Sequence, residues 1–171
     1  ASGVNKDEDP YLVHYYRIDF DGKNMTCLTP AEGNHYAVFS PDYKYLVDVY
    51  SKTDVPPVTE LRSAVDGKLL KTLETADISK LKANGWVAPE IFKAKGRDGK
   101  TDMWGLIQRP SNFDPNKKYP VIEYIYSGPG DQYVPKKFTP WLYYLQAVAE
   151  LGFIVVQLDA MSTSFRSLDF E

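Results

Sequence analysis

The sequence predicts a mixed fold in which an all-β half is followed by an α/β half. Up to about residue 75, alternating aromatic or β-branched and polar residues form short stretches separated by turn residues, which is typical of antiparallel hairpins. After residue 86, two longer apolar stretches flank a segment whose apolar residues are spaced as on one face of a helix. This pattern is typical of a strand–helix–strand crossover. With 43% hydrophobic and 25% charged residues, the 171-residue chain is expected to be globular.

The all-β half contains two similar hairpins. Their strands are 11–19 with 24–28, and 61–64 with 69–73. Each pair flanks an Asp-Gly-Lys turn, at Asp21 and at Asp66, and an Asp-Gly pair suits the positive φ angles of a tight turn. The two turns are 45 positions apart, which is about the length of a four-stranded propeller blade.

Two further strands, 36–39 and 45–50, complete such a blade. A single blade cannot bury both of its faces, so the pattern predicts further blades outside this chain. We therefore expect residues 1–75 to be the end of a β-propeller, and 76–86 to be a connecting helix and linker. Asp77 is the expected N-cap of that helix, which runs to residue 81.

Residues 87–171 are predicted to be the N-terminal part of an α/β-hydrolase domain. The expected elements are a hairpin of 90–94 and 102–108, a strand at 119–126 buried on both faces, a helix that Thr139-Pro140 caps and that includes Trp141 and Leu142, and a buried strand at 153–158. A hairpin ahead of a parallel crossover indicates a mixed sheet. The chain has no Gly-x-Gly-x-x-Gly motif of a Rossmann domain.

Composition argues against several classes of function. The net charge is −3 with both signs interspersed, so nucleic acid is not expected as a partner.

Cys27 is the single cysteine, which cannot form an internal disulfide and is expected to be a half-buried strand residue. Asp7, Glu8 and Asp9 form an acidic run that is expected to be a solvated loop, and we expect neither a metal site nor a cofactor.

A search for catalytic groups finds one candidate. No serine lies in a Gly-x-Ser-x-Gly frame, and the two histidines, His14 and His35, are expected to be surface residues of the all-β half. Tyr126 lies where a predicted strand opens into a glycine and proline loop. Its hydroxyl could stabilise an oxyanion, or Tyr126 could be a core aromatic whose hydroxyl bonds the backbone.

The stretch Lys117-Lys118-Tyr119-Pro120 through Tyr126-Ser127-Gly128-Pro129 resembles the segment that enters the hydrolase domain in the prolyl oligopeptidase family of serine peptidases, closest to its dipeptidyl peptidase IV members. Residues 102–110 and 152–159 resemble the neighbouring strands of that domain. The turn Phe39-Ser40-Pro41-Asp42 is similar to a recurrent propeller turn of the family.

This resemblance implies that the parent is a serine-type dipeptidyl peptidase that releases N-terminal dipeptides with proline at the second position. Tyr126 matches the tyrosine of the oxyanion hole. The serine, aspartate and histidine of the triad would lie beyond residue 171, so the chain is expected to be truncated before the nucleophile and inactive by itself. Asp159 is followed by Ala160-Met161-Ser162, which departs from the usual family pattern.

Two alternatives remain open at this point: a catalytically silent homologue that acts as an interaction module, and an acyl-peptide hydrolase or esterase on the same scaffold. Peptide substrates are the expected partners of the parent. An incomplete sheet edge could pair between chains, so a homo-oligomer is a further expectation. No compartment is assigned, although a periplasmic or secreted parent would fit the resemblance.

Overall fold

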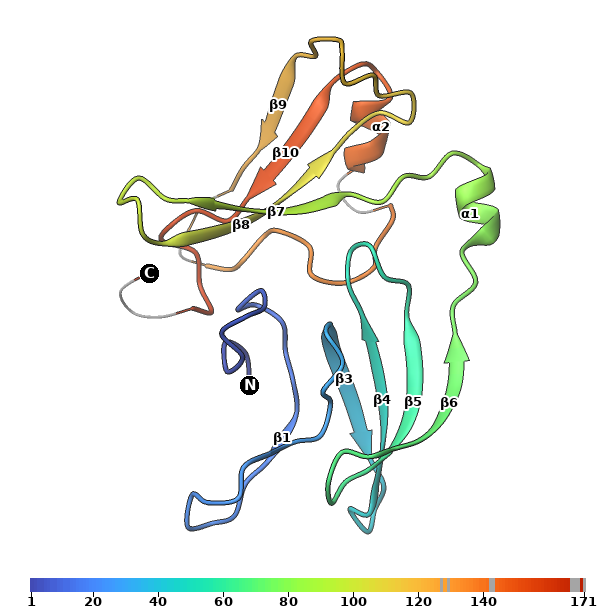
Figure 1. Cartoon of the computed structure of the whole chain (residues 1–171), viewed down its shortest axis with the longest axis vertical. Helices are drawn as coiled ribbons and strands as arrows, with labels where there is room; N and C mark the ends of the chain where they lie inside the picture. The colour runs from blue at the N-terminus through green and yellow to red at the C-terminus, as the bar shows by residue number, and fades with distance from the viewer. Residues whose placement is uncertain (127, 129, 142–143, 167–169, 171) are drawn as a thin grey trace. The chain divides into compact units, whose positions relative to one another are not determined.

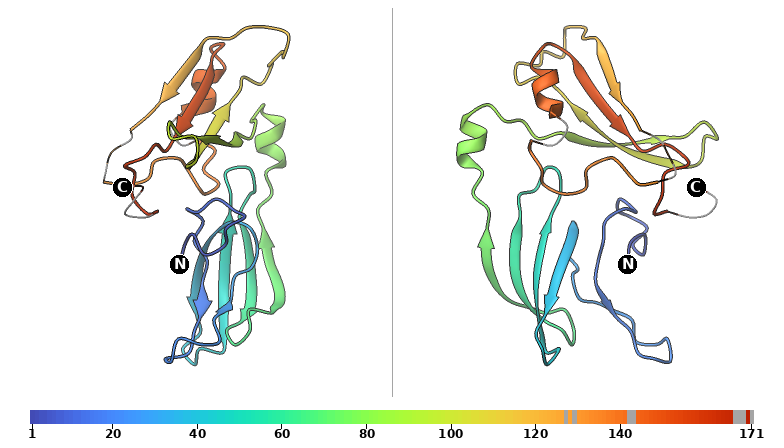
Figure 2. Two further views of the ribbon diagram at one scale, coloured as in Figure 1. Left: turned by 60° about the vertical axis from the view of Figure 1, so that its left-hand side comes forward. Right: turned by 180° about the vertical axis from the view of Figure 1, so that it is seen from behind.

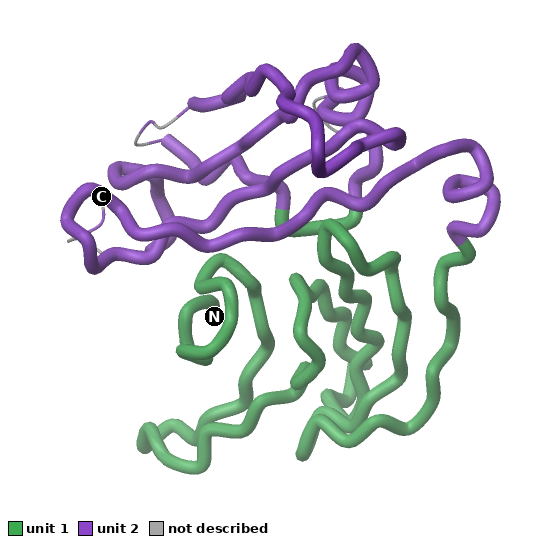
Figure 3. Tube along the Cα trace, turned by 45° about the horizontal axis from the view of Figure 1, so that its top comes forward, with its two compact units in different colours: residues 1–77, 136–138 green, residues 78–135, 139–171 purple. Residues whose placement is uncertain are grey.

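The structure is a computed structural model that describes residues 1–126, 128, 130–141, 144–166 and 170. The chain divides into two compact units, coloured separately in Figure 3. The first comprises Ala1–Asp77 together with Lys136–Phe138, and the second comprises Ile78–Pro135 together with Thr139–Glu171. The division after Asp77 lies inside the segment that the sequence suggested as a connection.

The first unit is built from antiparallel strands (Figure 1). β1 (Tyr16–Arg17) pairs with β2 (Thr26–Cys27), so the first predicted hairpin is present with shorter strands than expected. A second sheet has the order β3-β4-β5-β6, with strands Asn34–Phe39, Tyr45–Ser51, Val58–Ser63 and Leu69–Thr75. Each of these four strands is antiparallel to its sequence neighbour, as in a simple meander.

Three Asp-Gly-Lys turns join strands in this chain, and all three have the same local geometry. In each, the aspartate carboxylate accepts a hydrogen bond from the lysine N–H two residues on, at 3.0 Å (Asp21), 3.2 Å (Asp66) and 2.9 Å (Asp98). The glycines adopt φ angles of +80°, +72° and +68°. Hydrogen bonds from the Thr101 hydroxyl and from backbone N–H groups lower the pKa of Asp98 to about 2.

The inner face of the four-stranded sheet combines an apolar cluster with a buried polar network. Leu28, Leu46 and Ala64 form the cluster. Beside it, the fully buried carboxylate of Asp48 lies 2.9 Å from Nδ1 of His35 and 3.5 Å from Nε of Arg62. Charged groups on a buried face are tolerated because they satisfy one another.

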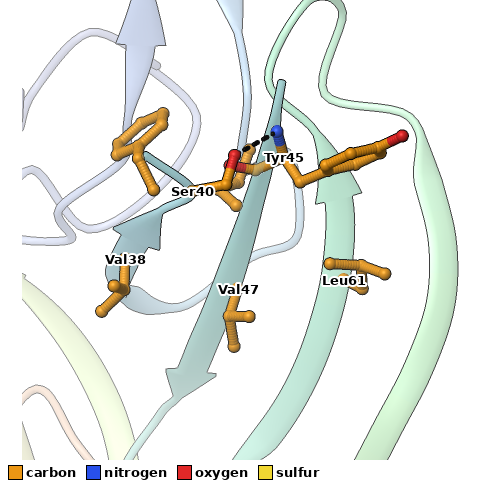
Figure 4. Close-up of a pocket in the computed structure, with 7 residues that line it drawn as sticks. Val38, Ser40, Tyr45, Val47 and Leu61 are labelled. Carbon is orange, nitrogen blue, oxygen red and sulfur yellow. Dashed lines mark hydrogen bonds between the residues drawn. The ribbon is translucent and has the colours of Figure 1, made fainter. Parts of the chain in front are cut away.

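The opposite face of the same sheet is apolar and open in the described structure. Val38, Val47 and Leu61 point to one side of neighbouring strands, where they line a shallow hollow of about 360 Å³ (Figure 4). At its rim, the Tyr45 N–H donates a 3.1 Å hydrogen bond to the Ser40 hydroxyl. This sheet therefore has one covered face and one uncovered face.

The second unit contains the mixed sheet that the sequence predicted. Its strands are β7 (Glu90–Lys95), β8 (Asp102–Gln108), β9 (Val121–Tyr124) and β10 (Ile154–Leu158), in the order β7-β8-β10-β9. β10 is parallel to β9 and antiparallel to β8. Helix α2 (Leu145–Ala149) packs against β10 through Leu145, Ala149 and Val155 (Figure 2).

The helices differ from the sequence-based expectation at their starts. α1 (Ser79–Ala83) has Ile78 at its N-cap without a side-chain hydrogen bond, so Asp77 does not cap it. α2 begins at Leu145 after Tyr144, whose φ is +52°, so the expected cap at Thr139-Pro140 is wrong. Leu142, expected in this helix, lies outside the described residues. Neither α1 nor α2 is long and apolar enough to cross a membrane.

The strand expected at 119–126 is shorter and more exposed than predicted. β9 covers only Val121–Tyr124, and all four of its residues are exposed, with Val121 at 62%. The prediction of a strand buried on both faces is therefore wrong. β9 is an edge strand with β10 as its one neighbour in the described sheet, and α2 packs on β10 and β8 instead.

The two Asp-Gly-Lys turns of the first unit offer a matched test of backbone crowding. A Cβ at Gly67 would lie 2.6 Å from the Cys27 carbonyl oxygen, whereas a Cβ at Gly22 meets nothing within 4 Å. Gly22→Ala should cost about 1 kcal/mol from the left-handed backbone alone. Gly67→Ala should cost at least twice as much in a urea titration. Equal losses would show that the contact with Cys27 does not constrain the turn.

Removing the buried carboxylate of Asp48 should destabilise the first unit strongly. Asp48→Asn leaves His35 facing a neutral amide, while Arg62 keeps its buried ion pair with Glu60, so the loss should be about 1–3 kcal/mol. Asp42→Asn is the control, because the Asp42 carboxylate pairs with Lys44 on the surface and its side chain is 51% exposed. Urea denaturation followed by far-UV circular dichroism should separate the two variants, because all three tryptophans lie in the second unit and do not report on the first. Similar midpoints would contradict a structural role for Asp48.

Candidate functional site

Two strand ends lie at one edge of the mixed sheet in the second unit. β9 and β10 are parallel neighbours, so their carboxyl ends meet at the same edge. Tyr126 follows the end of β9 by two residues, and Asp159 follows the end of β10 directly. Parallel sheets present functional groups at this edge. We use the term strand-end site for Tyr126, Tyr133, Gln157 and Asp159.

The Tyr126 side chain is exposed and is supported on one side by another ring. Its exposed fraction is 56%, and its ring stacks on that of Tyr133 with centroids 3.9 Å apart and planes 27° apart. A Cβ at Gly128 would lie 2.7 Å from a Tyr126 ring carbon, so a larger residue there would displace the Tyr126 ring. Ser127 and Pro129, the other members of the motif, lie outside the described residues.

The backbone of Tyr133 is held by two buried side chains of the β10 segment. The Asp159 carboxylate accepts hydrogen bonds from the N–H of Tyr133 at 2.8 Å and from the N–H of Val134 at 3.1 Å. The Gln157 amide donates a 2.9 Å hydrogen bond to the Tyr133 carbonyl oxygen. Gln157 and Asp159 are each only 1% exposed. The loop that carries Tyr133 is thereby attached to a strand of the sheet.

This arrangement leaves the Tyr126 hydroxyl available as a donor to a ligand. Within the described part of the chain, that hydroxyl forms no hydrogen bond with another residue, whereas Gln157 and Asp159 are engaged with the backbone. A phenolic hydroxyl is a neutral hydrogen-bond donor that can face negative charge on an oxygen atom. The geometry therefore suits stabilisation of an oxyanion better than proton abstraction.

Gln157 and Asp159 are functional candidates to which the sequence assigned no role. The sequence pattern could have identified them, because both are polar residues two positions apart at the end of an otherwise apolar strand. Alternation places them on the same side of β10. Their partners, however, come from a loop about 25 positions earlier, and no local pattern predicts that pairing.

The two histidines are buried in the first unit, so the expectation of surface histidines is wrong. His35 is 3% exposed, and its Nε2 lies 2.7 Å from the Ala31 carbonyl oxygen. His14 is 5% exposed, with Nδ1 2.7 Å from the Thr29 carbonyl oxygen and Nε2 2.9 Å from a Glu8 carboxylate oxygen. Each ring is buried and has one nitrogen within hydrogen-bond distance of a backbone carbonyl oxygen.

The acidic run at the start of the chain is also more structured than expected. Asp9 is 8% exposed, and its carboxylate lies 2.7 Å from the Lys136 ammonium inside the first unit. The Glu8 side chain is buried against His14, so the interpretation as a solvated loop is wrong for both residues. Cys27 is a half-buried strand residue, as predicted. Among the described residues, no group of three histidine, cysteine or acidic side chains could hold a metal ion.

Comparison with known proteins gives a consistent result. The family model for the dipeptidyl peptidase IV N-terminal region matches residues 4–57. A Schizosaccharomyces pombe protein named as a dipeptidyl aminopeptidase is 35% identical over 161 residues, which are 92% of this chain and 20% of that protein. An Aspergillus terreus protein named dipeptidyl-aminopeptidase B is 31% identical over 163 residues, covering 92% of this chain and 18% of the relative.

Solved structures agree with these relatives. The crystal structure of Porphyromonas gingivalis dipeptidyl peptidase 4 matches 87% of this chain and 21% of its own, with 29% identity and a TM-score of 0.69. A Bacteroides ovatus structure described as a dipeptidyl aminopeptidase IV matches 91% of this chain and 22% of its own, with 31% identity and a TM-score of 0.78. The resemblance to dipeptidyl peptidase IV that was inferred from the sequence is confirmed. The chain spans about a fifth of the length of these relatives.

Proposed function

We propose that this chain, which is dipeptidyl peptidase IV-like in sequence and structure, is part of a serine peptidase that releases N-terminal dipeptides with proline at the second position. The observation that carries the proposal is the exposed Tyr126 hydroxyl at the carboxyl edge of β9 and β10. The names of the relatives as dipeptidyl aminopeptidases support a peptidase over an esterase on the same scaffold.

In this proposal the two units are parts of two larger domains. The β3-β4-β5-β6 meander is a propeller blade, and its open apolar face would pack against the adjacent blade. The β7-β8-β10-β9 sheet is the beginning of an α/β-hydrolase sheet. The relatives match about nine-tenths of this chain, which supports the proposal that both units correspond to neighbouring parts of the same relatives.

The proposed role of Tyr126 is electrostatic. When a serine attacks the carbonyl carbon of a peptide bond, the carbonyl oxygen gains negative charge in a tetrahedral intermediate. A hydroxyl that already points at that oxygen stabilises it without reorganisation during the reaction. The nucleophilic serine, the histidine base and the orienting aspartate belong to parts of the peptidase outside this chain, because its serines lack the required glycine frame and its two histidines are buried in the first unit.

Tyr126→Phe tests the proposed role in the full-length protein. The change removes one oxyanion donor and keeps the ring, so kcat for a Gly-Pro chromogenic substrate should fall about 10-fold to 1,000-fold with little change in thermal stability. Tyr43→Phe is a matched control, because Tyr43 is an exposed tyrosine, at 73%, between β3 and β4 of the first unit. If Tyr126→Phe leaves kcat unchanged, Tyr126 is not an oxyanion donor.

The 171-residue chain alone should be inactive. It should neither hydrolyse a Gly-Pro chromogenic substrate nor be labelled by a fluorophosphonate, because labelling requires an activated serine. The full-length protein, treated in parallel, is the positive control. Turnover that co-purifies with the chain through successive columns would contradict the assignment of the triad to other residues.

A further inference from the structure

Asp159 is a buried acid whose role the proposed function does not yet explain. It is 1% exposed, and its carboxylate accepts hydrogen bonds from two successive backbone N–H groups, those of Tyr133 and Val134. Burying a carboxylate is costly unless donors replace the lost water. Here the donors come from a loop, so the acid and the loop segment stabilise each other. The 133–134 backbone has little freedom to leave this position.

Gln157 holds the same segment from its other backbone group. Its amide donates to the Tyr133 carbonyl oxygen at 2.9 Å, while Asp159 accepts from the Tyr133 N–H at 2.8 Å. Both backbone groups of Tyr133 are therefore bonded to side chains of one short segment. That segment is the end of β10, which is hydrogen-bonded to β8 and to β9. Tyr133 is consequently fixed relative to the sheet.

Tyr126 needs such support because the strand itself does not supply it. β9 ends at Tyr124, so the Tyr126 backbone lies outside the ladder, and its side chain is 56% exposed. The stacked ring of Tyr133, with centroids 3.9 Å apart, is its principal aromatic contact. A hydroxyl at the end of an unsupported side chain would sample several positions, whereas an oxyanion donor must be in place before the charge develops.

We propose that Asp159 is a positioning residue for Tyr126 and acts through the Tyr133 backbone and ring. This inference rests on the proposed function of Tyr126. Asp159 fixes the backbone of Tyr133, the Tyr133 ring fixes the plane of the Tyr126 ring, and the Tyr126 hydroxyl is thereby held at the edge of the sheet. Asp159 itself does not contact the substrate.

Kinetics of the full-length protein provide the first test. Asp159→Asn keeps one acceptor oxygen but loses the charge-assisted bonds, and should lower kcat about 10-fold with little change in KM. Tyr133→Leu removes the stacking ring without disturbing the buried acid, and should have a similar effect. Tyr133→Phe keeps the stacking ring, so its kcat should fall less than that of Tyr133→Leu.

A double-mutant cycle then separates positioning from general destabilisation. If Asp159 acts through the Tyr126 hydroxyl, adding Asp159→Asn to Tyr126→Phe should reduce kcat by less than about 2-fold further, because the hydroxyl to be positioned is gone. A reduction as large as in the wild-type background would overturn the proposal. Tyr133→Leu in the same two backgrounds repeats the test if Asp159→Asn does not fold.

A spectroscopic measurement distinguishes failure of this inference from failure of the proposed function. 3-Fluorotyrosine incorporated at position 126 should give one sharp ¹⁹F signal, which should shift or broaden in Asp159→Asn and in Tyr133→Leu but less in Tyr133→Phe. An unchanged signal overturns the positioning role. If the signal responds while Tyr126→Phe has normal kcat, the positioning stands as structure and the catalytic role of Tyr126 is refuted.

Discussion

Buried carboxylates that must be paired organise both units of this chain. Asp48 on β4 is fully buried, and it is satisfied by side chains of two neighbouring strands, His35 and Arg62. Asp159 at the end of β10 is 1% exposed, and it is satisfied by backbone N–H groups of a loop. An unpaired carboxylate at either position would carry a large desolvation cost, so each acid determines where its partners lie.

The two acids have different consequences because their partners differ. The partners of Asp48 lie on other strands of its own sheet, so the network stabilises the meander. The partners of Asp159 belong to a loop, which allows a strand to specify the position of a segment with no regular structure of its own. A residue on such a loop can be held as firmly as one on a strand. This is the support that we propose for the Tyr126 hydroxyl.

The differences between expectation and structure have more than one origin. An apolar run such as 119–126 indicates a strand, but its burial depends on which elements cover it, and β9 has a single neighbour in the described sheet. Thr139-Pro140 carries a good capping signal, yet the helix begins only at Leu145, where its residues reach β10. The start of the helix follows packing, because burial of an apolar face contributes more than a cap. The exposure of β9 has a different cause, which is that no further element covers it in the described sheet.

The sequence by itself determined the parts of the structure that depend on neighbouring residues. The Asp-Gly turns, the alternation in β3 to β6, the mixed sheet and the location of Tyr126 after β9 all follow from local conformational preferences and strand periodicity. Only the tertiary structure decided that His14 and His35 are buried, and that Asp159 holds Tyr133 beneath Tyr126. These outcomes depend on hydrogen bonds between residues far apart in the chain, and the desolvation energy that requires such bonds arises only when the sheets assemble.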